Sequence, residues 1–265
     1  MRFYPNAPWP TAAEISDSVK GDKTFLVLYR LLYFRHLLSK ISGGVDRGTL
    51  LRHHVDAWAA FVDFFELMLD ATRASELELP ASWIFETLGQ DLLYYFQQFH
   101  ELRAAPDGGA VGALVIDDDG VADDDDDRFA NTGSAPPDSR VSTAVAASAT
   151  ASPDDAALSS VWTLRAVLTF LHRIADAADA AGVSASPSGT RSLAAYFARL
   201  ALTRLYVKLG DYATALACAR PLGVLAGDGA YSRLAKAHVS LAYYTGFALM
   251  MVHRCAAEEA AFANH

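Results

Sequence analysis

The chain has 265 residues, of which 52% are hydrophobic, so it holds enough apolar material to bury a core. Its formal net charge is −9, but residues 107–155 alone contain twelve Asp and two Arg. The rest of the chain is therefore close to neutral, and the total charge indicates neither a nucleic-acid-binding surface nor an acidic coat on the folded part.

Cysteine content and hydropathy place the chain among soluble proteins. Cys218 falls inside a predicted helix and Cys255 directly before one, which is typical of reduced thiols in a cytosolic or nuclear protein and not of a disulfide framework. The N-terminal sequence MRFYPNAPWP lacks the basic start and continuous apolar run of a signal peptide. Residues 25–38, the longest apolar segment, are interrupted by two Arg and one His, whereas a membrane span needs about 20 apolar residues. We expect a soluble, cytoplasmic protein without a membrane partner.

The N-terminal part is predicted to be helical after an extended start. Three prolines within the first ten residues disfavour helix there, and Trp9 is expected to clamp onto a neighbouring helix. A short helix is predicted over residues 12–19 and longer ones over 22–41, 49–72 and 81–102. Their apolar residues at helical spacing are the candidate core, among them Phe25, Leu28, Leu32, Trp58, Phe61, Phe65, Met68, Trp83, Leu88, Leu92, Tyr95 and Phe99.

A change of composition divides the chain. Between residues 104 and 156 the sequence is rich in Asp, Gly, Pro, Ala and Ser and shows no sustained period, which predicts a disordered acidic linker. The predicted organisation is an N-terminal helical segment over 1–103, the linker over 104–156 and helical repeats over 157–265.

Helices are predicted to resume at residues 158–181. They continue over 193–209 and 211–219, a pair separated at Gly210 with Asp211 as N-cap, and then over 232–252 and 256–263. The helix 193–209 is apolar on more than one side, and alternate Ala residues over 213–219 allow close approach to it. Such a pair cannot bury itself alone. The sequence therefore predicts an all-α fold of stacked helical hairpins, which ends without a polar capping repeat and so indicates a shortened form of a longer chain.

The pair also resembles a tetratricopeptide repeat. Leu202, Tyr206, the Gly210-Asp211-Tyr212 turn and Ala215 match the pattern, whereas Arg199, Ala219 and Gly227 depart from it. A weaker second copy, with Cys255 in place of Tyr212, lies 43 residues on, while standard repeats are about 34 residues long. These are degenerate tetratricopeptide-like repeats.

Several short motifs, in family order, resemble subunit L of eukaryotic translation initiation factor three. They are Asn6-Ala7-Pro8-Trp9-Pro10, Phe25-Leu26-Val27-Leu28-Tyr29-Arg30, Lys40-Ile41-Ser42-Gly43-Gly44, Leu77-Glu78-Leu79-Pro80, Tyr95-Phe96-Gln97-Gln98-Phe99, Leu209-Gly210-Asp211-Tyr212, Tyr231-Ser232-Arg233, Gly246-Phe247-Ala248 and Phe262-Ala263-Asn264.

The resemblance implies a non-catalytic scaffold subunit that acts in translation initiation without a cofactor. Implied partners are the sister subunits called K and E and, indirectly, the small ribosomal subunit. The family's first region and its C-terminal winged-helix PCI module have no counterpart here, and the acidic segment looks longer than the family's connection at that place. The main alternative is a free-standing tetratricopeptide-like adaptor that binds peptides. An enzyme would require a cluster of titratable residues in a pocket, which the sequence does not indicate.

No residue pattern indicates a catalytic, cofactor or metal site. His53 and His54 are adjacent and point about 100° apart on a helix. The spacing of His172 and Asp176 favours an ion pair. Residues 115–126 match a calcium loop poorly, because Val115 stands where the first Asp belongs.

Two groups of residues on or beside the helix over 22–41 have competing interpretations. Arg30, Arg35, His36 and Lys40 scatter around the helix, which favours ion pairs and helix-end complementarity over direct RNA contact. Trp9, Tyr29, Tyr33 and Phe34 are the candidate partner interface, with burial in the core as the competing interpretation.

Overall fold

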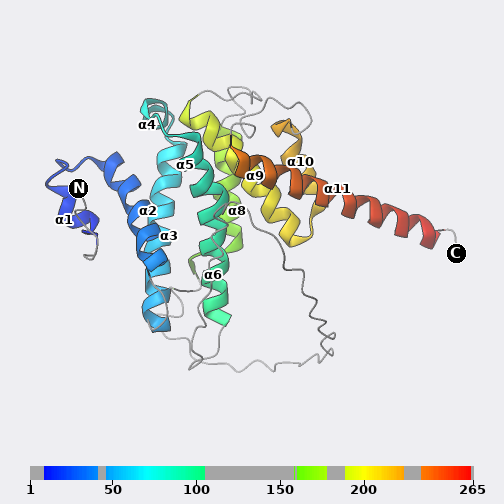
Figure 1. Ribbon diagram of the computed structural model, residues 1–265, viewed down its shortest axis with the longest axis horizontal. Helices are drawn as coiled ribbons and strands as arrows, with labels where there is room; N and C mark the ends of the chain where they lie inside the picture. The colour runs from blue at the N-terminus through cyan, green and yellow to red at the C-terminus, as the bar shows by residue number, and fades with distance from the viewer. Residues whose placement is uncertain are drawn as a thin grey trace, which may run out of the picture.

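The computed structural model describes residues 9–40, 46–104, 158, 160–177, 189–223 and 234–263. Every regular element within these ranges is a helix, which confirms the predicted all-α fold. The predicted linker lies outside the described residues from residue 105 onward, as do Ser42-Gly43-Gly44. Figure 1 shows long helices packed side by side, with the last one running outward from the group.

The first helices begin where a side chain caps their free N–H groups. They are α1 (Ala12–Ser16), α2 (Lys23–Lys40), α3 (Arg47–Leu69) and α4 (Ala71–Glu76). One helix was predicted over residues 49–72, but Asp70 is extended (φ −72°, ψ 106°) and divides it. Its N–H closes α3 on Glu66 O, while its carboxylate accepts hydrogen bonds from the N–H groups that open α4.

A single helical rod covers residues 81–104, as predicted, but its middle is wound differently. α5 (Ala81–Phe85) and α6 (Leu92–Ala104) are joined by a π-helical turn, η1 (Glu86–Asp91). The π turn alters the backbone hydrogen bonding, and Arg204 from a later helix donates to the carbonyl of Gly89 there.

The C-terminal helices are α8 (Leu164–Ala177), α9 (Thr190–Leu209), α10 (Tyr212–Ala219), a short 3₁₀ turn η3 (Arg220–Leu222) and α11 (Ala235–Ala263). Gly210 ends α9 at φ +81°, and Asp211 accepts a hydrogen bond from Thr214 N at 3.0 Å, as predicted. The predicted division between helices over 232–252 and 256–263 is wrong, because α11 runs through without a break.

The helices after residue 157 pack in sequence. α8 lies against α9, α9 against α10, and α11 contacts both α9 and α10. Ala215 and Ala219 of α10 are buried, whereas Ala213 and Ala217 are exposed. Only one side of α10 therefore packs closely against the neighbouring helices. This arrangement is compatible with the predicted helical repeats.

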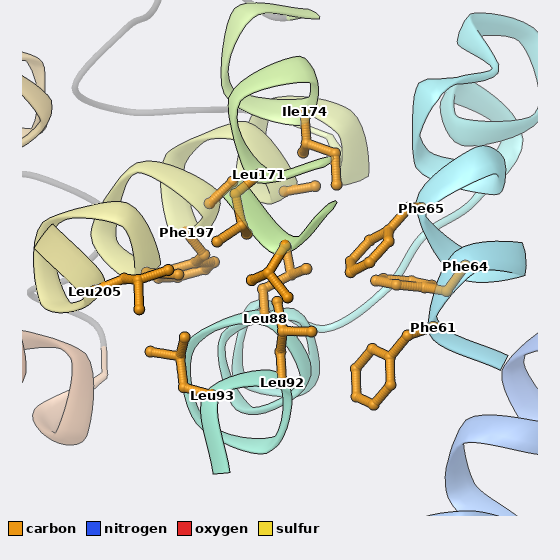
Figure 2. Close-up of a cluster of buried hydrophobic side chains, with 14 of the residues drawn as sticks. Phe61, Phe64, Phe65, Leu88, Leu92, Leu93, Leu171, Ile174, Phe197 and Leu205 are labelled. Carbon is orange, nitrogen blue, oxygen red and sulfur yellow. The ribbon is translucent and has the colours of Figure 1, made fainter. Parts of the chain in front are cut away.

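Helices on both sides of residues 105–157 share one core. The buried cluster extends from Leu31 on α2 to Leu241 on α11. Figure 2 shows phenylalanines of α3 on one side of Leu88 and Leu92, with Phe197 and Leu205 of α9 on the other. Phe85 and Phe197 are in direct ring contact, with centroids 5.4 Å apart. The two helical groups are therefore bound by apolar burial, while the predicted boundaries at 103 and 157 stay predictions.

Trp162 links the two groups at the start of α8. Its side chain is fully buried, with ring centroids 4.9 Å from Trp58 and 5.5 Å from Phe61. Its Nε1 donates to His54 O at 2.7 Å, and its own carbonyl oxygen lies 2.9 Å from His100 Nε2. Its φ of +51° is in the left-handed region, which costs about 1–2 kcal/mol for a residue other than glycine. The surrounding contacts hold the residue in this unfavourable conformation.

Trp162→Ala is expected to lower the free energy of unfolding by about 3–5 kcal/mol, because it removes a fully buried ring and leaves His54 O without its donor. Urea unfolding followed by circular dichroism measures the change. Val239→Ala on α11, at a side chain that is 68% exposed, is the control and should stay within about 0.5 kcal/mol of the parent. Equal stabilities of the two variants would contradict the role given to Trp162.

Cutting the chain between residues 105 and 157 should leave the two helical groups associated, because they share one core. A site-specific protease sequence inserted near residue 130 allows a single cut, and gel filtration without denaturant then shows whether the fragments co-elute. Separate elution would mean that the two groups are independent domains.

Candidate interaction surfaces

The N-terminal segment lies on α2 through aromatic contacts. The Trp9 ring stacks on His36 at 4.5 Å and on Tyr29 at 6.2 Å between centroids. Tyr29 Oη donates to Pro10 O at 2.6 Å, and Phe25 extends the row by stacking on Tyr29. The prediction that Trp9 clamps onto a neighbouring helix is confirmed.

The four residues predicted as a partner interface fall into two pairs. Trp9 contacts Tyr29, while Tyr33 meets Phe34 edge to face at 5.4 Å. Trp9, Tyr29 and Tyr33 are half-buried and retain some accessible surface. Phe34 is only 8% exposed and belongs to this chain's own core. A partner interface through these residues stays a prediction. Phe34 could contribute little contact area to it, because its side chain is buried.

Two arginines of α2 form ion pairs within the molecule. Arg30 pairs with Asp63, and Arg35 pairs with Asp91 and, at 3.2 Å, with Glu86 of the π-helical turn. Arg35 Nε also donates to Asp91 Oδ2 at 2.7 Å. The ion pairs predicted for the two arginines are confirmed.

Asp91 sits in a buried environment beside Arg35. Burial raises the pKa of its carboxyl to about 6, and the arginine opposes that shift. The cavity next to the pair has a volume of only about 10 Å³, which is about the space of one water molecule. This polar cluster therefore ties α2 to η1 and has no room for a substrate.

A larger hollow lies along α8. It is open to solvent, has a volume of about 520 Å³, and is lined by one side of the helix, including His172 and Asp176. His172 Nε2 lies 2.8 Å from Tyr206 Oη, so its partner is a hydroxyl on α9 and not Asp176 as the spacing suggested.

His54 and Cys218 are buried in structural surroundings. His54 is 1% exposed, lies against Tyr95 and Phe99, and its Nδ1 has no hydrogen-bond partner. Burial, aided by the charge of His53, lowers the pKa of His54 to about 4. Burial also raises the pKa of the Cys218 thiol, which disfavours the nucleophilic thiolate. Over the ranges that the structure describes, no three His, Cys, Asp or Glu side chains gather as a metal site.

The outer side of α11 carries exposed apolar residues that the sequence analysis did not single out. Val239, Tyr243 and Met250 are 68%, 63% and 50% exposed, and Gly246 lies between the last two. Their spacing of four, three and four residues places them along one face of the helix. This spacing was visible in the sequence, but which face of an apolar helix stays uncovered depends on its neighbours.

Among the helices described, none is both long and apolar enough to cross a membrane.

Comparison with known proteins gives one family match. The family model described as "RNA polymerase I-associated factor PAF67" matches residues 53–264, which is most of the chain.

Curated relatives align along almost the whole chain. Eukaryotic translation initiation factor 3 subunit L of Mus musculus is 27% identical over 278 aligned residues, and that of Homo sapiens is 26% identical, each covering 99% of this chain. The protein of the same name from Drosophila willistoni is 27% identical and covers 96%. The chain spans 42% of the length of these relatives. The resemblance to subunit L drawn from the short motifs is thereby confirmed.

His54 should make the fold sensitive to acid. The unfolded chain protonates this imidazole below its ordinary pKa of 6.5, whereas the folded protein resists protonation down to about pH 4. The free energy of unfolding should therefore fall as the pH drops through this window, by about 3 kcal/mol in total. His54→Phe removes the titrating group and should flatten the dependence measured by urea unfolding at stepped pH.

The matched control is His253→Gln, at an exposed position on α11, which should keep the parental slope. Burial raises the pKa of Asp91 from 3.8 to about 6, so its effect on the free energy of unfolding becomes more favourable as the pH falls through this range, opposite to that of His54. The variants are therefore compared in an Asp91→Asn background. A slope that persists in the His54→Phe variant would contradict the assignment to His54.

Proposed function

The chain belongs to the Paf67 family, and from this membership we propose that it is a scaffold subunit of the eukaryotic translation initiation factor 3 complex. The observation that carries the proposal is the alignment of 99% of the chain with relatives named as subunit L of this factor. Its role would be architectural, with contacts to other polypeptides and without catalysis or a cofactor.

The chemistry of the side chains supports binding over catalysis. The described titratable groups serve the fold: Arg35 holds the π-helical turn, and the imidazole of His172 meets a tyrosine hydroxyl. The Cys218 thiol has a raised pKa, which is the opposite of what a nucleophile needs. By contrast, α11 presents large apolar side chains to solvent, which is the kind of surface that partner proteins cover.

The proposed partners are the sister subunits of the complex, those called K and E, and through them the small ribosomal subunit. The working compartment would be the cytoplasm. Trp9, Tyr29 and Tyr33, with Phe34 beneath them, are one proposed contact surface for a sister subunit, since aromatic residues are enriched at protein interfaces. The organisation into helical segments over 1–103 and 157–265 around the acidic segment 104–156 belongs to the same proposal.

A free-standing tetratricopeptide-like adaptor is the competing function. The observation in its favour is the hairpin of α9 and α10, which turns at Gly210-Asp211 and is packed through the small residue Ala215. An adaptor of this kind would hold short peptides as a stable monomer.

Affinity purification of the tagged full chain from its own cells, followed by mass spectrometry, tests the proposal. We expect recovery of several initiation factor 3 subunits in comparable amounts, together with small-subunit ribosomal proteins that dissociate in high salt. Recovery of RNA polymerase I subunits would instead follow the description of the family, and it would contradict the proposal.

The matched control is the Trp162→Ala chain with the same tag, which should lose the subunits if assembly requires the shared core. A monomer by gel filtration that captures only short peptides would favour the adaptor.

A further inference from the structure

One side of α8 packs into the shared core, and another side borders the open hollow. Leu171 and Ile174 point from α8 into the core, as Figure 2 shows. On the side of the hollow, His172 is bonded to Tyr206. The other residues of α8 that line the hollow, which we call the α8 face, are Leu164, Arg165, Leu168, Thr169, Arg173 and Asp176. The four polar residues among them are exposed, and the two leucines are half-buried.

The charges of the α8 face lack ionic partners within the described part of the molecule. None of the ion pairs between residues that the structure describes includes Arg165, Arg173 or Asp176. The guanidinium carbon of Arg173 lies 5.8 Å from the ring centroid of Phe170, a neutral group that leaves the positive charge uncompensated. Charges of both signs are therefore available on one exposed surface.

Two of these charges stand at the helix ends that suit them least. Arg165 lies in the first turn of α8, where the helix dipole favours an acidic side chain. Asp176 lies in the last turn, where the dipole favours a basic side chain. Exchanging the two charges would therefore stabilise the isolated helix. Their actual placement indicates a contact outside the helix.

Arg165 and Asp176 are related by the symmetry of an antiparallel contact. They are eleven positions apart, close to three helical turns, so they project from nearly the same side of α8, roughly 16 Å apart along its axis. A two-fold axis midway between them exchanges their places. In an antiparallel pair of α8 helices, Arg165 of each copy therefore faces Asp176 of the other. A parallel pair would place like charges together.

The other residues of the α8 face fit the same arrangement. Leu164 and Leu168 lie one turn apart along one edge, and the two-fold axis extends them into a row of four leucines. Thr169 and Arg173 lie along the opposite edge, so the guanidinium of one copy reaches the hydroxyl of the other. Thr169 Oγ1 donates to the carbonyl oxygen of Arg165 in its own helix at 2.7 Å, and its lone pairs can accept this bond.

We propose that the α8 face binds the α8 face of a second copy of this chain in an antiparallel, two-fold contact. Charge complementarity selects this occupant, because the face carries both signs at positions that the two-fold axis exchanges. The contact is small and its ion pairs lie at exposed ends, so the dimer is transient and sensitive to salt. The inference goes beyond the proposed scaffold role and does not depend on it.

Sedimentation equilibrium of the purified full chain measures the dimer. Over concentrations from about 1 to about 200 μM, we expect the mass to rise toward twice that of one chain. Raising the salt from about 50 to about 500 mM should increase the dissociation constant at least about fivefold, because the ion pairs are exposed.

Two charge-reversal variants locate the contact. Arg165→Asp makes both ends of the α8 face acidic, and Asp176→Arg makes both ends basic, so each variant alone should weaken its dimer at least about tenfold. Both changes suit the helix dipole, so α8 should stay folded. An equimolar mixture should form a mixed dimer about as tight as the parental one, because acidic ends then face basic ends. Fluorescence-detected sedimentation with one variant dye-labelled follows the mixture.

The matched control is Lys236→Asp, which makes the same change of charge at an exposed position on α11. It should change the dissociation constant less than about twofold. Misfolding cannot explain a loss in each single variant that mixing restores.

Four outcomes would overturn the proposal. They are a parent that stays monomeric up to about 200 μM, single variants that dimerise like the parent, a mixture that stays monomeric, and a different occupant. The last would be shown by a monomeric parent whose co-purified initiation factor subunits are lost in either single variant. Dimerisation is measured on the purified chain and subunit recovery on cell extracts, so the failure of this inference is distinguishable from the failure of the proposed function.

Discussion

The burial of Trp162 is the contact on which the rest of the structure depends. It lies beyond the long acidic stretch, yet its indole donates to a carbonyl of α3 and packs on Trp58 and Phe61. The residue adopts an unfavourable backbone conformation to make these contacts. These contacts fix the start of α8 on α3, where Phe65 and Phe170 also stack at 4.9 Å between ring centroids, and α9 packs on α8 as well as on α5 and η1.

Polar links reinforce this apolar joint at its edges. Thr190, at the start of α9, accepts a hydrogen bond from Leu79 N at 3.0 Å and donates to Leu77 O. Arg204, further along the same helix, reaches Gly89 O in the π-helical turn. Each link satisfies a group that local structure leaves free, so the second set of helices completes the hydrogen bonding of the first.

The same packing logic explains why one side of α11 stays exposed. A helix that is apolar on two sides needs a neighbour on each side, as α9 has in α8 and α10. Among the helices that the structure describes, α11 has neighbours on its inner side, while Val239, Tyr243 and Met250 are exposed. A helix added on this side would continue the mode of packing that builds the fold itself.

The sequence by itself determined the local features, because their signals lie within a few residues. Helical spacing predicted the helices, Asp211 and Gly210 predicted the turn between α9 and α10, and the scatter of Arg30 and Arg35 around α2 predicted ion pairs. Only the tertiary structure decided which residues meet across the chain. The π-helical turn at 86–91 and the unbroken α11 depart from local expectation. The bond from Trp162 to His54 joins residues 108 positions apart. No local pattern encodes such a pairing, because it depends on which apolar faces cover one another, and the same choice leaves the outer side of α11 exposed.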